Sequence, residues 1–249
     1  MDAAHEASVK LAAEREEVLV PLINEAYDKR LANVDPYLDW YYSLPADYER
    51  LLQYFAGTVE SGMQEQLTQR INQGVDESVL AEKFEYYLEQ SEALKTNLIE
   101  SLQQYEIDSV PLWLVVPVES AGTNSLAEPL APTQQFLDAA KRAGLSVGIG
   151  AIAGVIATKA AQKILARPFF KKIVGEVLEK LAIRGLLAEG GTAIAPGVGT
   201  VVGVGVGFVA DYLFLKADEA MNRASYKTEI VGAIEDSRAE MLALVAAAG

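Results

Sequence analysis

Residues 191–210 read GTAIAPGVGTVVGVGVGFVA, a stretch without a charge in which glycine recurs among small and β-branched side chains. A second uncharged stretch, GLSVGIGAIAGVIAT, occupies residues 144–158, and 13 of the 19 glycines fall between Gly144 and Gly207. Glycine weakens a helix in water, but it lets two helix backbones come into close contact in lipid. The two stretches therefore indicate a protein that contacts a membrane.

Glycines four residues apart lie on one face of a helix and can form a packing surface. The spacing predicts helix packing at Gly144, Gly148, Gly150, Gly154, Gly199, Gly203 and Gly207. Residues 201–209, VVGVGVGFV, also alternate with the two-residue period of a strand. We favour a helix because the pattern passes without a break into residues 211–223.

Membrane insertion of these stretches is marginal by length. A span requires about 20 apolar residues, and only residues 191–210 reach that length without a charge. Extending residues 144–158 to Ala166 brings in Lys159 and Lys163, whose ammonium groups would have to reach the headgroups or a polar lumen. The alternative is a hairpin buried in the core of a soluble helical domain, and the sequence leaves both open.

Charge is divided unevenly along this chain of net charge −14. Residues 1–140 contain 25 acidic and 8 basic side chains, whereas residues 141–190 contain 9 basic and 3 acidic ones. An acidic chain repels nucleic-acid phosphates, while a basic block beside apolar helices suits anionic lipid. Residues 169–187 also predict a basic amphipathic helix, and we expect its apolar side to lie on a membrane. We expect a membrane-surface role for Lys159, Lys163, Arg167, Lys171, Lys172 and Lys180, although ion pairing or solubilisation explains these side chains equally well.

The predicted organisation has three parts. Residues 1–107 read as long amphipathic helices that can form a bundle, with starts near Asp35, Ser43 and Asp76 and one helix running from Leu44 to about Ile71. Prolines predict a linker over 108–132. Residues 133–249 form a glycine-rich apolar region, beginning with one helix from about 133 to 167 and ending in an amphipathic helix.

Aromatic residues gather at the start of the second helix. This predicted cluster consists of Tyr37, Trp40, Tyr41, Tyr42 and Tyr48. Tyrosine and tryptophan favour interfaces, sugars and membrane belts because each carries an apolar body and one polar end. Core packing is the commoner use of rings at helical spacing.

Catalytic signals are weak. Residues 144–148 match the G-x-S-x-G pattern, but the only histidine, His5, lies upstream, so the hydrolase order is impossible. Glu85, Glu89 and Glu92 share a helix face, yet a di-iron bundle site also needs histidines. We expect no enzyme, no cofactor and no metal site. Residues 1–20 do not form a signal peptide, so export would imply a leader or anchor upstream.

Two resemblances rest on particular segments. DPYLDWYYSLPADYERL (35–51) and GVGTVVGVGVGFVADYLFLKADEAMNR (197–223) resemble a bacterial family of uncharacterised membrane-associated proteins, in which a DWYYS-like block precedes a glycine-rich segment ending in DYxxLKxDExxNR. This resemblance covers about 30–60 and 195–225 and implies association with the bacterial envelope. The layout is also similar to pore-forming colicin domains, except that the basic helix 169–187 separates the two apolar arms.

The sequence therefore predicts an all-α protein with an amphipathic helical bundle and a glycine-rich apolar helical pair. We expect it to be membrane-associated in the bacterial envelope, in the periplasm or at the inner membrane, with anionic lipid and further copies of itself as partners. It would insert or self-associate through its glycine-rich helices and form a pore or another oligomeric assembly. The competing hypothesis is a soluble helical scaffold or lipid-binding protein whose apolar pair forms the core.

Overall fold

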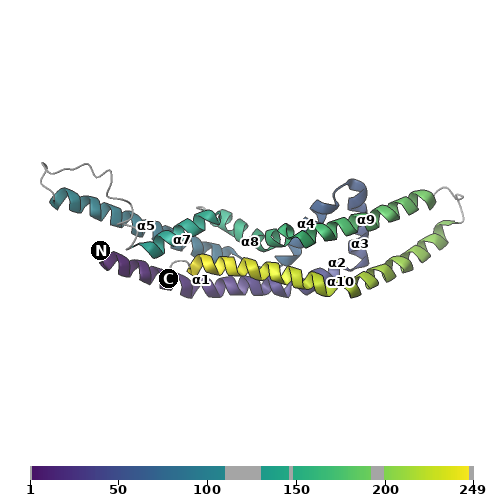
Figure 1. Ribbon diagram of the computed structural model, residues 1–249, viewed down its shortest axis with the longest axis horizontal. Coiled ribbons are helices and arrows are strands. Elements are labelled where there is room, and N and C mark those ends of the chain that lie inside the picture. The colour runs from purple at the N-terminus through teal and green to yellow at the C-terminus, as the bar shows by residue number, and fades with distance from the viewer. Residues whose placement is uncertain (1, 110–129, 146–147, 192–198, 247–249) are drawn as a thin grey trace. The chain divides into compact units, whose positions relative to one another are not determined.

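A computed structural model describes residues 2–109, 130–145, 148–191 and 199–246, and every regular element in these ranges is an α-helix (Figure 1). The all-α prediction is confirmed. The helices are α1 (Asp2–Ala32), α2 (Val34–Tyr41), α3 (Leu44–Ala56), α4 (Val59–Ile71), α5 (Ser78–Ser109), α7 (Ala131–Arg142), α8 (Ile149–Ala166), α9 (Pro168–Gly191) and α10 (Gly199–Ala246). The strand alternative for residues 201–209 is wrong, because α10 runs through them.

The helices form two compact units, and each unit combines segments that lie far apart in the sequence. Unit 1 comprises residues 1–26, 76–157 and 238–249, and unit 2 comprises residues 27–75 and 158–237. Helices α1, α8 and α10 contribute to both units. This grouping differs from the sequence-based division at 108–132, a segment that lies mostly outside the described residues. Long helices explain the difference, since one helix can find different partners along its length.

Unit 1 is built from the first part of α1 together with α5, α7, the start of α8 and the end of α10. Its core contains Leu19, Phe84, Phe136, Ile152 and Val245, all of which are buried. Arg15 is also buried there, with its guanidinium 4.1 Å from the centre of the Phe136 ring and donating to the Val245 carbonyl at 3.0 Å. Burial lowers the pKa of Arg15 to about 10, so its charge persists at neutral pH.

Unit 2 is built from the end of α1, helices α2 to α4, the end of α8, α9 and most of α10. Its core is formed by buried side chains from all of these segments, including Leu38, Leu67, Ile164, Ile173 and Ile230. Two hydrogen bonds of buried side chains in this unit join distant segments. The Tyr27 hydroxyl lies 2.7 Å from the Ser237 hydroxyl, and Arg30 donates to the Asn72 side chain at 2.9 Å.

Two predicted long helices are each broken in two. The segment predicted as one helix over 44–71 is α3 and α4, and Gly57 between them has φ +70°. The segment predicted as one helix over 133–167 is α7 and α8, with Gly144 at φ +74° after α7. Glycine adopts this left-handed conformation at little cost, which makes it a common helix terminator. The sequence predicted neither break, because the apolar spacing continues across both of them.

Several helix starts agree with the sequence. The Ser43 side chain accepts a hydrogen bond from the Ala46 backbone N–H, and Asp76 accepts one from Ser78 ahead of α5. Pro168 is the first residue of α9, a position at which its missing N–H breaks no helical hydrogen bond.

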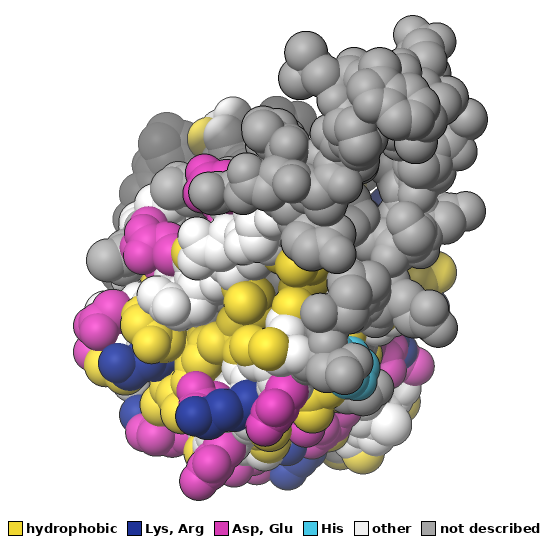
Figure 2. Space-filling model, turned by 90° about the vertical axis from the view of Figure 1, so that its left-hand side faces the viewer, with side chains coloured by type: hydrophobic (Ala, Val, Ile, Leu, Met, Phe, Trp, Pro, Cys, Tyr) yellow, Lys and Arg dark blue, Asp and Glu magenta, His cyan; other side chains and the backbone are white. Residues whose placement is uncertain are grey.

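Some hydrophobic side chains remain exposed, among them Val9, Val79, Tyr86 and Ile99. Figure 2 shows one face of the molecule on which hydrophobic side chains lie among acidic and basic ones.

Candidate functional site

Helices α9 and α10 form an antiparallel hairpin in unit 2 (Figure 1). The Tyr226 hydroxyl donates to the Glu176 carboxylate at 3.0 Å, and the Lys180 ammonium lies 3.0 Å from the Asp218 carboxylate. As the residue number rises along α9, its partner's number falls along α10, which defines the antiparallel order. Arg167, just before α9, makes ion pairs with Glu229 and Asp236 and closes the base of the hairpin.

The distal end of the hairpin carries the uncharged stretch of residues 191–210. Beyond the Lys180–Asp218 pair, α9 continues to Gly191 and α10 returns from Gly199. At 1.5 Å per helical residue, these arms are about 16 Å and about 28 Å long. Residues 190–210, which contain no charge, include the end of α9, the connection and the start of α10. The hairpin therefore presents its least polar sequence at the end farthest from its ion pairs.

The apolar face of α9 is buried inside unit 2, whereas the sequence predicted that it would lie on a membrane. Its members Phe170, Ile173, Val174, Val177 and Leu181 are buried. Helices α3 and α4 of the same unit pack against α9. The expectation that this face lies on a membrane is therefore not met in this conformation, because the face forms part of the unit 2 core. Leu178 and Ile183 are the exposed large hydrophobic side chains of α9 among those described.

The predicted membrane-surface cations lie in different surroundings. Arg167 and Lys180 make the ion pairs given above, and Lys172 lies 3.7 Å from Glu176 on its own helix. Lys171 is exposed, whereas Lys159 and Lys163 on α8 are half-buried. Ion pairing, the alternative considered from the sequence, thus applies to Arg167, Lys172 and Lys180.

The predicted packing glycines also behave in different ways. Gly144 and Gly148 have φ +74° and +128° and lie between α7 and α8, so they do not form a helix face. Gly150 and Gly154 lie on α8, and an added Cβ at either would meet no heavy atom within 4 Å. The predicted helix face through Gly144 and Gly148 is therefore wrong, while packing of Gly150 and Gly154 against another helix in lipid stays a prediction. Gly199, Gly203 and Gly207 do lie on one helix, but what surrounds them falls outside the described residues, so their packing stays a prediction.

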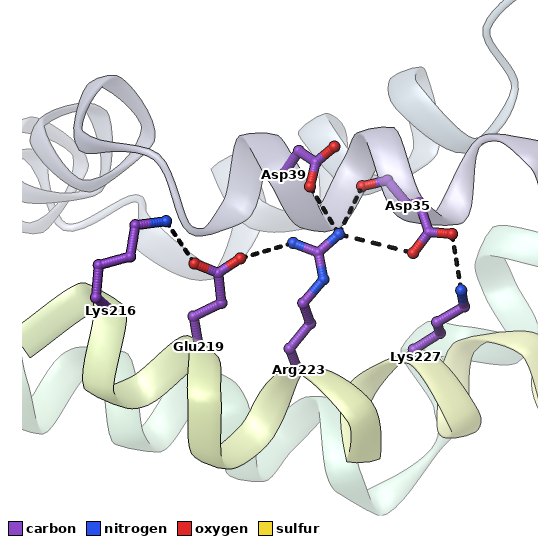
Figure 3. Close-up of polar contacts among 6 residues, drawn as sticks. All are labelled: Asp35, Asp39, Lys216, Glu219, Arg223 and Lys227. Carbon is purple, nitrogen blue, oxygen red and sulfur yellow. Dashed lines mark hydrogen bonds and ion pairs between the residues drawn. The ribbon is translucent and has the colours of Figure 1, made fainter.

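Helix α2 is held against α10 by a network of charges (Figure 3). Arg223 donates to the Asp39 carboxylate at 2.7 Å, and the Lys227 ammonium donates to the Asp35 carboxylate at 2.7 Å. Glu219 accepts from both Lys216, at 2.6 Å, and Arg223, at 2.8 Å. The two segments that carry the family resemblance, about 180 residues apart, therefore meet at this network.

The network changes the acidity of its members. The hydrogen bond from Lys227 is the main cause that lowers the pKa of Asp35, and the charges of Lys227 and Arg223 add to it. The hydrogen bond from Lys216 likewise lowers the pKa of Glu219, and the same bond raises the pKa of Lys216. Each partner is thus held in its charged form.

The aromatic cluster lies beside this network. Tyr37, Tyr41 and Tyr42 are buried, Trp40 is half-buried, and Tyr48 is 44% exposed. Tyr226 of α10 stacks on Tyr42, with ring centres 6.4 Å apart, and meets Tyr41 edge-on. Core packing, the alternative considered from the sequence, is confirmed for the three buried tyrosines. Tyr48 does not join their core.

Chemistry at this cluster is restricted by burial. Desolvation raises the pKa of Tyr37 to about 12 and also raises the pKa of Tyr41, Tyr42 and Tyr226, so these phenols remain protonated at neutral pH. The cavity among these rings measures about 10 Å³, which is too small for a ligand. Among the residues that the structure describes, no group of three or more acidic or histidine side chains is placed to hold a metal ion. The cluster therefore fixes the hairpin base and offers no space for a substrate.

The sequence did not identify Tyr226, Arg223 and Lys227 as part of this site. The only signal was the DYxxLKxDExxNR pattern of the resemblance, which ends at Arg223 and does not include Tyr226 or Lys227.

Comparisons of the chain with protein-family models, curated proteins and solved structures found no match. Over the described ranges, no helix combines the length and the apolar character needed to cross a membrane.

We expect unit 2 to lose stability in acid through Asp35. Because its pKa is lowered in the folded state, the carboxylate stabilises the fold above the unfolded pKa of about 3.9 and loses that contribution as pH falls through the folded value. Asp35→Asn should lower the melting temperature at pH 7 and converge with the unchanged protein towards pH 2. The loss should stay below about 1 kcal/mol, because the pair is half-exposed.

Glu179→Gln is the matched control, since Glu179 is exposed on α9 and makes no ion pair within the described part of unit 2. Its melting temperature should follow that of the unchanged protein at every pH. An Asp35→Asn difference that stays constant from pH 7 to pH 2 would show that the carboxylate charge is not the source of the stabilisation.

Proposed function

We propose that the protein acts by binding a membrane through the distal end of the α9–α10 hairpin, where it associates with further copies of itself. The observation that carries this proposal is the polarity of the hairpin. Ion pairs of Arg167 and Lys180 hold its base, while its distal end, residues 190–210 beyond Glu189 and before Asp211, contains no charge. Such a hairpin would enter a bilayer in one orientation, because its charged base stays in water and its apolar end moves into the hydrocarbon.

Arm length supports shallow insertion. The uncharged part of α10, residues 199–210, is about 18 Å long, close to one leaflet of a hydrocarbon core about 30 Å thick. In α9 the charges of Arg184 and Glu189 limit entry to its last residues, so the hairpin would enter one leaflet mainly through α10, without either helix crossing the bilayer. Helical backbone satisfies its own hydrogen bonds, as the hydrocarbon requires.

Contact between copies would use the glycine face of α10. Gly199, Gly203 and Gly207 recur at four-residue intervals on one helix, and small side chains let two helices come close in lipid. Anionic lipid is the preferred surface in this proposal because Lys171, Lys172 and Lys180 are exposed on α9. Assembly into a pore, and a place in the bacterial envelope, belong to the same proposal. Catalysis is no part of it.

Flotation with liposomes tests the proposal. The full chain should rise with vesicles that contain about one-third anionic lipid and should rise less with purely zwitterionic vesicles, because headgroup attraction adds to apolar insertion. Release of a trapped dye then separates a pore from a surface anchor. Failure to float with vesicles of either composition would contradict membrane binding.

A second candidate function is favoured by the buried face of α9. Since Phe170, Ile173 and Val177 pack inside unit 2, the helix already has a protein partner and needs no lipid to cover this face. A soluble helical scaffold or lipid-binding protein would have this construction. Such a protein would stay at the bottom of the flotation gradient and would show the same oligomeric state with and without vesicles.

A further inference from the structure

Unit 1 contains a groove that the hairpin proposal does not use. It lies along α5 and α7 and has a volume of about 450 Å³. Its apolar surface comes from Leu88, Ile99, Leu137, Ala140 and Leu145. Ile99 is 37% exposed, and Leu88 and Leu137 are half-buried, so these side chains are open to a partner.

Acidic side chains border this groove. Glu85, Glu89 and Glu92 lie on successive turns of α5, and Asp138 stands on α7. Within the described part of the chain, none of the three glutamates has an ion-pair partner, and like charges four residues apart on a helix repel one another. The two cations at the groove, Lys95 and Lys141, leave the four carboxylates in excess.

We propose that this groove binds an amphipathic helix whose apolar side is flanked by lysine or arginine. The apolar side would cover the leucines and Ile99, and the flanking cations would meet the glutamates of α5. Helices bind other proteins in this way through side chains spaced at i, i+3, i+4 and i+7. From Glu85 to Ile99 the wall is about 21 Å long, enough for about four helical turns.

The acidic rim argues for a basic helix over the other occupants. An anionic lipid surface would be repelled by the glutamates, and an acidic helix would add to their mutual repulsion. A second copy of this chain is disfavoured because its own basic amphipathic helix, α9, has its apolar face buried in unit 2. The groove and its rim lie entirely in unit 1, so the inference is independent of the hairpin.

A labelled peptide tests the inference. The probe is a peptide of about 18 residues, five helical turns, made of leucine and lysine at amphipathic spacing, and its fluorescence anisotropy is followed as the full chain is added. We expect this peptide to bind saturably. A peptide in which glutamate replaces each lysine should not bind. The double substitution Glu89→Lys with Glu92→Lys should weaken binding at least tenfold, because two attractive contacts become repulsive.

Matched variants separate the groove from general attraction to an acidic protein. Glu6→Lys with Glu17→Lys makes the same charge change at exposed positions on α1 of the same unit and should leave binding within twofold. Ile99→Gln removes exposed apolar surface without changing charge and should also weaken binding. Equal losses in the two double variants, or no binding to the unchanged chain, would overturn the inference. Sedimentation of the protein without peptide measures self-association. If the double variant Glu89→Lys with Glu92→Lys changed self-association relative to the unchanged protein, that result would also count against the inference.

Discussion

Val204→Asp should abolish flotation with liposomes. The substitution puts a carboxylate into the uncharged part of α10, near the distal end of the hairpin. Aspartate at the centre of an inserting helix costs about 3 kcal/mol on the insertion scale, whereas valine contributes slightly in favour. Partitioning should therefore fall about a hundredfold. The measurement is the fraction of protein that floats with anionic vesicles.

The control for this substitution is Val79→Asp. Val79 is 48% exposed near the start of α5 in unit 1, so the new carboxylate stays in water and the net charge changes equally. Val79→Asp should float like the unchanged protein. Equal loss in both variants would mean that overall charge governs binding, and full flotation of Val204→Asp would exclude insertion of the hairpin end.

Gly203→Leu should abolish assembly on liposomes while leaving helix content nearly unchanged. Gly203 is the central glycine of the predicted packing face on α10, and a leucine there would hold two helix backbones apart. Leucine is also the better helix former by about 0.8 kcal/mol, so loss of assembly could not be explained by a weaker helix. Chemical cross-linking of the floated protein measures assembly, and circular dichroism measures helix content.

Gly175→Leu provides the matched comparison. Gly175 is exposed on α9, and an added Cβ there meets no heavy atom within 4 Å, so the same change should leave assembly intact. Wild-type levels of cross-linked oligomer in Gly203→Leu would contradict the packing role of this glycine face.

The sequence predicted the helical class and several helix starts because these depend on local chemistry. Ser43 and Asp76 mark helix starts by accepting hydrogen bonds from backbone N–H groups only a few residues away. The break at Gly57 was missed because apolar spacing continues across it, and glycine within a helical pattern is a weak signal. Spacing alone does not distinguish one long helix from two helices that bury the same side.

The candidate site was less predictable because its partners come from tertiary structure. The aromatic block was visible, but Tyr226, which stacks on Tyr42, lies 184 positions away along the chain. The apolar face of α9 was recognised correctly as a face, yet nothing in the sequence distinguishes a lipid partner from a protein partner. Packing against α3 and α4 decides that question for this conformation.

The hydrogen bond between Arg15 and the Val245 carbonyl joins positions 230 residues apart, and it has a consequence for synthesis. Unit 1 needs residues 238–246 to complete its core, so a chain emerging from the ribosome cannot finish this unit until that segment is available. Contacts of such long range slow folding and leave apolar helix faces uncovered in the meantime. Nascent chains should consequently engage chaperones until residues 238–246 have emerged.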